Sequence, residues 1–600
     1  MSSKVRFIAV VDFGSQYVHL ITRVLRELGV AARTLPPTAK AMELRQAAGV
    51  ILSGSPRSVL KNAVPYRRHL TAGRLPTLGI CYGQQLVAHE RGGTLTPGKI
   101  REYGKATLEL TLAGKRHLLL AGVAPHSQVW MSHGDSVTKL PQGFVRLGST
   151  ASLPLAAVAH RTKPIFGVQF HPEVTHTAFG RSILTNFAFS ICNLKPTTSI
   201  GTLEKISTEI KTQVGAKKKV FLLVSGGVDS TVAFTLLNRI LGTKRVYGLH
   251  LNTGLMRTGE TRQVKLAIKQ LGFKNLHVVN AAPDFFQATK GLTEPEAKRQ
   301  AIGETFLKVK DRIAAKLGGK PSTWLLGQGT IYPDTIESAG TKHAAKIKTH
   351  HNRIGVLQTM AAQGLLAEPL KELYKDEVRE LGQQLGLPQK LLWQHPFPGP
   401  GLGVRILCLS KRDVAEFNHT NFPHVRLGHY HTRVLPVRSV GVQGDERSYA
   451  HPLAVDAPYA AARQIHAAGR TLLNRHRHLN RVVLKLAGPT LSAGTSHLAY
   501  LIRKRVKLLQ QAEAMVIYEI KRASAYYKLW QCPVVLLPFG TQHGESIVIR
   551  PFTSREVMTG EAYVLPQALV ARITRKLRKL PVDYLFYDLT DKPPGTVEWE

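Results

Sequence analysis

Short apolar runs alternate with amphipathic helical patterns in the first third of the chain. Residues 5–11, 49–52 and 75–80 are apolar enough to form buried strands, and residues 16–28 place apolar side chains at helical spacing before Gly29 ends the pattern. Strands that alternate with helices form mostly parallel sheets with helices on both faces. The pattern therefore predicts an α/β domain in this part of the chain.

The alternation resumes in the middle third and includes a distinctive loop. The apolar run 220–224 precedes a helical pattern that extends to residue 241, and further strands are predicted at 245–251 and 275–279. The loop between the first strand and its helix consists of Ser225, Gly226, Gly227, Val228, Asp229 and Ser230. Because glycines let the backbone approach a ligand and a helix N-terminus favours negative charge, this loop is predicted to bind phosphate.

The chemistry of this loop can be narrowed further. Asp229 offers a carboxylate to a metal ion that accompanies the phosphates. No GKS or GKT follows the glycines, which disfavours an ordinary kinase or GTPase. The segment 252–257, NTGLMR, follows the next predicted strand, and ligands of parallel sheets bind at the carboxyl ends of strands. We expect this segment to contact the base and ribose of a nucleotide.

A candidate nucleophile lies in the first domain, where the strand 75–80 ends in GICYG (79–83). This is the cysteine form of a nucleophile elbow, in which small neighbours permit a sharp turn and the following helix favours a thiolate. The segment GVQFHPEV could bring His171 beside Cys81 as a base, with Glu173 orienting the imidazole. The three side chains form a complete nucleophilic set.

Bulk properties limit the interpretation. Six hundred residues suggest about three to five domains. A net charge of +42 suits polyanion contact, anionic substrates or an adaptation of the host proteome. The cysteines form no CxxC pair, which indicates a reducing compartment and no cysteine zinc site. No signal peptide pattern or apolar run of about 18 residues is seen, so a cytoplasmic protein is predicted.

Four segments resemble the class I glutamine amidotransferases, which hydrolyse glutamine through a thioester. They are LSGSP (52–56), GICYGQQ (79–85), WMSHGD (130–135) and FHPE (170–173). The resemblance implies that Cys81 is the nucleophile, His171 the base and Glu173 the orienting acid. It also implies oxyanion and glutamine-binding roles for Gly54, Ser55, Tyr82 and Gln85.

Ser55 departs from this family's usual LSGGP. Serine resists a positive φ that glycine tolerates, and loss of one oxyanion donor can cost about 10² to 10³ in rate. We expect Ser55 to be tolerated, with slower hydrolysis if the position needs positive φ.

The SGGVDS loop resembles that of N-type ATP pyrophosphatases, and the order of the two regions is similar to the glutamine-hydrolysing GMP synthase family. Segments such as HPFPGPGLGVR (395–405), VGVQGD (440–445) and YDLTDKPPGTVEWE (587–600) extend the likeness over nearly the whole chain. The family makes GMP, AMP and pyrophosphate from XMP, ATP and glutamine, with Mg²⁺ accompanying ATP. The resemblance implies that Lys348, His350 and His351 belong to a lid. It implies XMP-binding positions at Arg299, Asp445, Lys592, Val597 and Glu598.

Some details depart from the family. Asn252 and Thr253 stand where the family's usual DNG or DHG has an acidic residue and its neighbour, which puts one ribose or metal contact in doubt. The stretch HHNRIG also differs from the HHNVGG that is common in the lid. Histidines 419, 424, 429 and 431 lack an acidic or cysteine partner and are read as loop residues.

The resulting architecture has three parts. We predict a class I amidotransferase domain at 5–192, an ATP pyrophosphatase domain at 200–404, and an α+β dimerisation and XMP-binding domain at 405–600 with an insertion near 450–496. The first two are α/β with parallel sheets, and the family implies a homodimer. Two alternatives stay open: another glutamine-dependent pyrophosphatase such as NAD synthetase, or a basic nucleic-acid-binding protein on this scaffold.

Overall fold

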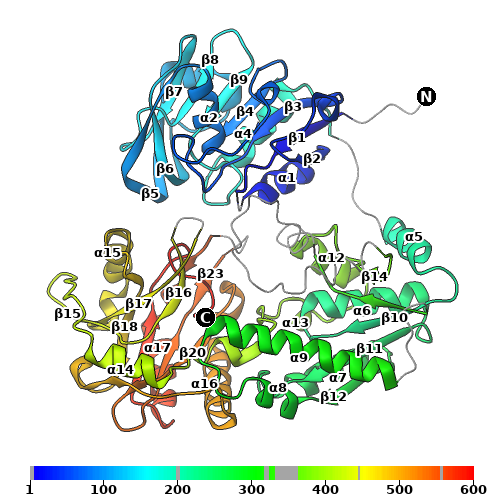
Figure 1. The fold of residues 1–600 in the computed structure, drawn as a ribbon, viewed down its shortest axis with the longest axis vertical. Coiled ribbons are helices and arrows are strands. Elements are labelled where there is room, and N and C mark those ends of the chain that lie inside the picture. The colour runs from blue at the N-terminus through cyan, green and yellow to red at the C-terminus, as the bar shows by residue number, and fades with distance from the viewer. Residues whose placement is uncertain are drawn as a thin grey trace.

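The structure is a computed structural model that describes residues 6–15, 17–196, 203–316, 323–331, 363–443, 446–554 and 559–600. Three large sheets organise these residues. Figure 1 shows the first sheet in the upper part of the molecule, the second at the lower right and the third at the lower left. The α/β and α+β classes predicted from the sequence are confirmed.

The first sheet has the strand order β2-β1-β3-β4-β9-β8-β7-β5-β6. Its parallel strands are β1 (Phe7–Val11), β2 (Ala32–Leu35), β3 (Ala47–Leu52), β4 (Thr77–Ile80) and β9 (Ile165–Val168). Its antiparallel strands are β5 (Thr94–Leu110), β6 (His126–Lys139), β7 (Phe144–Ser149) and β8 (Ala157–His160). The helices are α1 (Val18–Glu27), α2 (Tyr82–Glu90), α3 (Leu112–Arg116) and α4 (Gly180–Thr185).

The local chemistry explains these parallel strands. All five residues of β1, FIAVV, are buried, as expected for a strand covered on both faces. Helix α1 ends before Gly29, whose φ of 72° lies in the left-handed region that glycine adopts easily. The long β5 and β6 hairpin was not part of the sequence prediction, which expected a mostly parallel sheet.

The second sheet, in the order β12-β11-β10-β13-β14, is parallel throughout its described strands. They are β10 (Lys219–Leu223), β11 (Val246–Asn252), β12 (Leu276–Asn280), β13 (Trp324–Gly327) and β14 (Leu366–Ala367). The helices are α5 (Leu203–Val214), α6 (Val228–Leu241), α7 (Glu260–Gln270), α8 (Ala282–Ala288), α9 (Pro295–Lys316), α12 (Lys375–Gln384) and α13 (Gln389–Leu392). The strands predicted at 220–224, 245–251 and 275–279 are confirmed.

The third sheet is mixed, with the order β15-β17-β18-β25-β22-β20 and with β16 paired to β17. Its strands are β15 (His431–Val434), β16 (Ser439–Gln443), β17 (Glu446–Asp456), β18 (Leu479–Ala487), β20 (Val534–Leu537), β22 (Ser546–Ile549) and β25 (Tyr584–Asp588). Short ladders join β19 (Thr495–Ser496) to β21 (Phe539–Gly540) and β23 (Phe552–Thr553) to β24 (Glu561–Ala562). The helices are α14 (Lys411–His419), α15 (Ala462–Arg475), α16 (Arg503–Arg522) and α17 (Gln567–Leu577).

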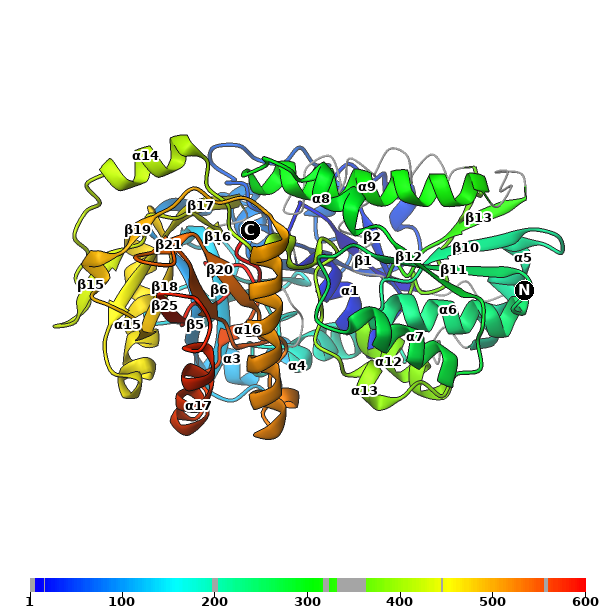
Figure 2. The same ribbon diagram turned by 90° about the horizontal axis from the view of Figure 1, so that it is seen from below.

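The second and third sheets share one apolar core. Phe221 on β10, Ile302 on α9 and Leu484 on β18 belong to the same cluster of buried side chains. In Figure 2, α15, α17 and α16 extend in the same direction from the third sheet. Lys576 of α17 and Glu519 of α16 form an ion pair of 2.6 Å between two of these helices.

The first sheet contacts the rest through polar side chains. On one side, Arg23 of α1 binds Asp376 of α12 at 2.7 Å, and the Tyr374 hydroxyl donates to the His19 carbonyl at 2.9 Å. On the other, Lys105 of β5 binds Glu561 at 2.5 Å. None of the helices in the described part of the chain has the length and apolarity needed to span a bilayer.

Candidate active sites

Cys81 occupies a sharp turn between β4 and α2. Its backbone has φ 51° and ψ −106°, an uncommon conformation for a residue with a side chain. Glycines make the turn possible, because a Cβ at Gly79 would lie 2.5 Å from the Gly83 carbonyl carbon. A Cβ at Gly83 would lie 2.4 Å from the Leu52 carbonyl oxygen. The predicted elbow is therefore present, and it holds the sulfur at the N-terminus of α2.

His171 and Glu173 follow β9, the strand next to β4. The Glu173 carboxylate lies 2.7 Å from Nδ1 of His171, and both side chains are buried. Burial alone would lower the pKa of His171, but the Glu173 carboxylate and a hydrogen bond with Cys81 raise it to about 10. The imidazole thus joins the sulfur to the carboxylate. The structure brings together the three side chains that the sequence singled out.

The other residues predicted around this sulfur lie on the surrounding loops. Gly54 faces the imidazole, since a Cβ there would lie 3.3 Å from Cε1 of His171. The Ser55 hydroxyl donates to the Phe13 carbonyl at 2.8 Å, and its φ is not positive. Tyr82 begins α2 directly after Cys81. The Gln85 amide nitrogen donates to the Asp135 carbonyl at 2.7 Å, which places the WMSHGD segment of β6 beside the elbow.

The second candidate site is a cavity of about 200 Å³ at the carboxyl end of β10. Ser225, Gly226, Gly227, Val228 and Asp229 line it, and the Ser230 hydroxyl lies 3.0 Å from that of Ser225. Gly226 has a φ of 93°, which explains the need for glycine at this position. The opposite walls come from distant segments, including Thr253, Met256, Arg257 and residues 394–399.

Lys375 is a cavity residue that the sequence reasoning missed. It begins α12, and its Nζ lies 2.7 Å from Oδ2 of Asp229. Residues 225–230 contain no lysine or arginine, so the cation beside the loop comes from another element. The signal was the stretch KDEVR at 375–379, where a lysine opens a helical pattern.

The loop suits a divalent cation held jointly with phosphates. Oδ1 of Asp229 is buried and has no hydrogen-bond partner among the described residues, so it is left for a ligand. A hard cation prefers such oxygen ligands. In the described part of the chain, no group of three or more His, Cys, Asp or Glu side chains gathers as a metal site. Among the described residues of the loop, Asp229 therefore offers one unengaged carboxylate oxygen to such a cation.

A network of charges connects this cavity to the C-terminal segment. Arg257, in the cavity wall, lies 3.4 Å from Glu513 of α16, and Glu513 binds Arg405 at 2.8 Å. Arg405 in turn binds the Glu598 carboxylate through Nε at 2.8 Å and Nη2 at 2.9 Å. Burial opposes ionisation of Glu598, yet Arg405 holds its pKa below the usual value.

The remaining predicted positions are partly accounted for. Arg299 of α9 reaches the backbone of Glu600, so it lies beside the segment that contains Val597 and Glu598. Lys592 forms a β-bridge with Gly560. Gln531, which was not singled out, donates to Glu598 at 3.1 Å. The lid residues Lys348, His350 and His351, and the predicted XMP-binding residue Asp445, lie outside the described residues.

The sequence matches three family models. Residues 9–191 match the class I glutamine amidotransferase family, residues 202–327 match the NAD synthase family, and residues 518–599 match the GMP synthase C-terminal domain. The NAD synthase match covers the phosphate loop but not the C-terminal segment.

Several relatives are similar over most of the chain. A probable GMP synthase [glutamine-hydrolyzing] of Leptospira interrogans is 41% identical over 604 residues, covering 99% of both chains. The GMP synthase [glutamine-hydrolyzing] of Thermobifida fusca is 35% identical over 99% of this chain and 98% of its own. That of Aquifex aeolicus is 42% identical over 75% of this chain and 89% of its own. This chain belongs to the glutamine-hydrolysing GMP synthase family.

Proposed function

We propose that this enzyme is a carbon–nitrogen ligase of guanine nucleotide synthesis that makes GMP from XMP, with glutamine as nitrogen donor and ATP as activator. The observation that carries the proposal is one chain with two chemically distinct centres. One contains the buried Cys81, His171 and Glu173, and the other contains the phosphate loop of β10, which charged side chains connect to the segment around Glu598.

In the first centre we assign nucleophilic catalysis to Cys81. Its sulfur attacks the amide carbon of glutamine, and the protonated His171 transfers a proton to the departing ammonia. Glu173 holds Nδ1 of the imidazole and stabilises the imidazolium. Water then hydrolyses the thioester to glutamate. Gly54, Ser55, Tyr82 and Gln85 are assigned to the oxyanion and glutamine positions.

In the second centre we assign the ATP phosphates to the loop from Ser225 to Ser230 and to Lys375. The XMP oxygen O2 attacks the α-phosphorus, pyrophosphate leaves, and ammonia then displaces AMP. Asp229 would hold Mg²⁺, which neutralises the charge on pyrophosphate as it leaves. The loop amides and Lys375 position the phosphates for departure.

We assign XMP to Arg299, Lys592, Val597 and Glu598, with Asp445 as a further position. We assign Lys348, His350 and His351 to a lid over the ATP phosphates. The support is chemical: two cations suit a phosphate, and a carboxylate suits the donors of a ribose or purine. We further propose that the enzyme works in the cytoplasm as a homodimer. All four cysteines are free and buried, as a reducing compartment permits. Light scattering of the purified enzyme would test whether it is a dimer.

The decisive experiment measures XMP-dependent AMP and GMP formation with either glutamine or ammonium. Cys81→Ala is expected to lose glutamine-dependent synthesis and to retain synthesis with ammonium. Asp229→Ala is expected to lose synthesis with both nitrogen sources while it still hydrolyses glutamine. Nicotinate adenine dinucleotide in place of XMP tests the NAD synthetase alternative, and preferential turnover of that substrate would overturn our proposal.

A further inference from the structure

The third sheet consists of two similar halves. In the first half, β15 is antiparallel to β17, and β17 is parallel to β18 across helix α15. In the second half, β20 is antiparallel to β22, and β22 is parallel to β25 across helix α17. The two last strands, β18 and β25, pair antiparallel in the middle of the sheet. The strand order is therefore the same when it is followed from either edge, as a two-fold axis between β18 and β25 requires.

The strand registers align the two halves residue by residue. Leu453 pairs with Val434 and Val482, and Ile547 pairs with Leu536 and Leu585. When Leu453 is placed on Ile547, the dipeptide Leu-Pro at 435–436 falls on the Leu-Pro at 537–538.

The same alignment matches two ion pairs of reversed charge. Asp456 falls on Arg550 and Lys485 on Asp588. Asp456 binds Lys485 at 2.5 Å, and Arg550 binds Asp588 at 2.9 Å. A shared Leu-Pro dipeptide, a matched topology and a matched ion pair together indicate an internal repeat. We name residues 431–487 the first repeat and residues 534–588 the second repeat.

The segment after the second repeat crosses the axis and lies on the first repeat. The Val440 amide donates to the Trp599 carbonyl at 2.8 Å, and the Val442 amide donates to the Pro594 carbonyl at 2.7 Å. Gly441 forms a β-bridge with Gly595. Strand β16 of the first repeat therefore holds the segment 594–599, which contains two of the positions assigned to XMP.

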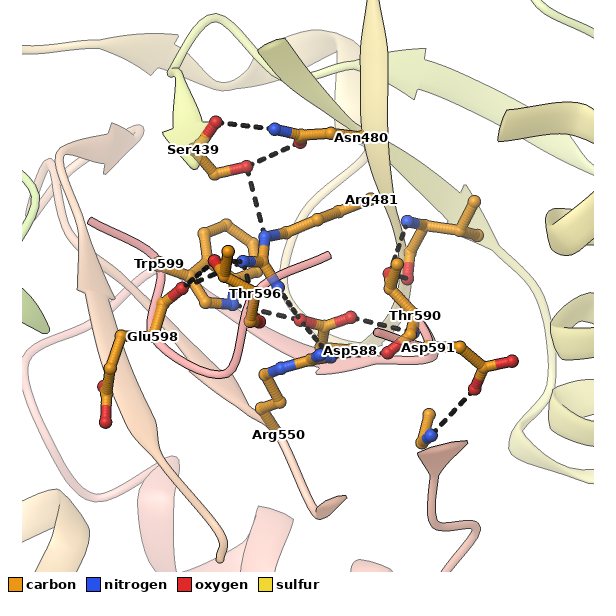
Figure 3. Close-up of polar contacts among 12 residues, drawn as sticks. Ser439, Asn480, Arg481, Arg550, Asp588, Thr590, Asp591, Thr596, Glu598 and Trp599 are labelled. Atoms are coloured by element: carbon orange, nitrogen blue, oxygen red, sulfur yellow. Dashed lines mark hydrogen bonds and ion pairs between the residues drawn. The ribbon is translucent and has the colours of Figure 1, made fainter. Parts of the chain in front are cut away.

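Arg481 of the first repeat is the main side chain in this contact (Figure 3). Its side chain is fully buried, and its Nη2 donates to the carbonyls of Thr596 and Glu598, each at 3.0 Å. Its Nη1 binds Asp588 of the second repeat at 3.0 Å, and its guanidinium lies 4.7 Å from the Trp599 ring centre. Tyr584 occupies the equivalent position in the second repeat, so this guanidinium is present on one side of the axis only.

We propose that the first repeat completes the XMP site of its own chain, with Arg481 as a positioning residue that fixes the backbone of residues 596–598 and so directs the Glu598 carboxylate. The proposal rests on the assignment of XMP to this segment. In a pair of identical domains, a second copy could supply the surface that holds residues 594–599. Here the first repeat of the same chain supplies that surface. Each chain then contains a complete site, whether or not the enzyme assembles into a dimer.

The first test compares Arg481→Met with Lys485→Met, a matched change on the same strand. Asp588 keeps Arg550 as its counter-charge in Arg481→Met, so this variant should fold. With ammonium as nitrogen donor we expect Arg481→Met to raise the KM for XMP about tenfold, the effect of one or two lost charged hydrogen bonds. The KM for ATP and the hydrolysis of glutamine should stay unchanged. Lys485→Met should leave all three unchanged, and an unchanged KM for XMP in Arg481→Met would overturn the proposal.

A second readout does not depend on activity. Hydrogen exchange of peptides that cover 439–443 and 592–600 should be faster in Arg481→Met than in wild type and unchanged in Lys485→Met. Protection equal to wild type in Arg481→Met would contradict the positioning role. A wild-type enzyme that does not aminate XMP would refute the assigned function, whereas the exchange result would still decide whether Arg481 holds the segment.

The third test asks whether the XMP site is completed within one chain or between two chains. Arg481→Met and Glu598→Ala chains are co-expressed with different tags and purified together. If the first repeat acted on a second copy, mixed dimers would regain one intact site, and about a quarter of the wild-type activity measured at XMP below the wild-type KM would return. We expect no recovery beyond the two single variants, and recovery to that level would show that the site is completed between chains.

Discussion

The Glu173 carboxylate raises the pKa of the buried His171, and this effect can be measured. In Glu173→Gln the carboxylate that raises the pKa of His171 is gone, and burial, which lowers it, remains. We expect glutamine hydrolysis to fall about tenfold or more and its pH profile to move to lower pH. Ammonium-dependent synthesis should be unaffected, and an unshifted profile would contradict the role given to Glu173.

The same pair makes stability depend on pH. The pKa of His171 is higher in the folded protein than its value of 6.5 in the unfolded chain, so the favourable interaction is complete below about pH 6.5 and is lost as the pH rises toward about 10. The stability difference between wild type and Glu173→Gln should therefore shrink across this range. Urea unfolding at pH 6 and at pH 9.5 measures it.

Lys375 is expected to serve the phosphates that the loop binds. It pairs with Asp229 in the structure, and an ATP phosphate would compete for the same ammonium group. We expect Lys375→Met to raise the KM for ATP about tenfold, since a charged contact is lost, and to leave glutamine hydrolysis intact. Lys371→Met, an exposed lysine four residues earlier, is the control; equal effects of the two would exclude a specific role.

At the level of elements, the first turn of α12 contacts both the phosphate loop and helix α1. Lys375 contacts the phosphate loop, while the adjacent Asp376 binds Arg23 of α1. Helix α1 follows Tyr17, whose ring lies 4.8 Å from that of His171. The helix pair thus lies between the phosphate loop and the imidazole.

Charge reversal tests whether this contact matters. We expect Asp376→Arg to lower glutamine-dependent synthesis several-fold relative to ammonium-dependent synthesis, because two cations would then face each other. The double variant Arg23→Asp with Asp376→Arg should recover most of the loss. Recovery separates the effect of the ion pair from other effects of each substitution. A double variant no more active than Asp376→Arg would show that this ion pair does not couple the two centres.

Local patterns predicted the elements that depend on neighbouring residues. The strands around 220–224 and the turn at Cys81 follow from apolar runs and from glycine sterics. The φ of Ser55, which is not positive, and the bond from its hydroxyl to the Phe13 carbonyl could be read only from the structure. The third sheet could not be anticipated, because its central pairing of β18 with β25 joins residues about a hundred positions apart and no local signal encodes register. Lys375 was missed for the same reason, since its partner lies 146 residues away.

At the scale of the whole molecule, the net charge of +42 predicts contact with polyanions. Exposed cations such as Arg575, Arg578 and Lys579 lie at the end of α17. We expect weak, sequence-independent binding to DNA or RNA that falls at least about tenfold between about 50 and about 200 mM salt. Replacement of these three cations with Glu should weaken nucleic-acid binding in a fluorescence anisotropy assay. Binding that does not change with salt would rule out an electrostatic origin.

Two repeats joined in one chain can diverge in a way that two identical copies cannot. In a symmetric pair every substitution appears twice, so a new charge near the axis would face its own copy. Here the first repeat pairs Asp456 with Lys485, and the second repeat has the charges reversed, with Arg550 paired to Asp588. Fusion therefore frees each half to specialise: the second repeat leads into the segment assigned to XMP, and the first can evolve as its permanent support.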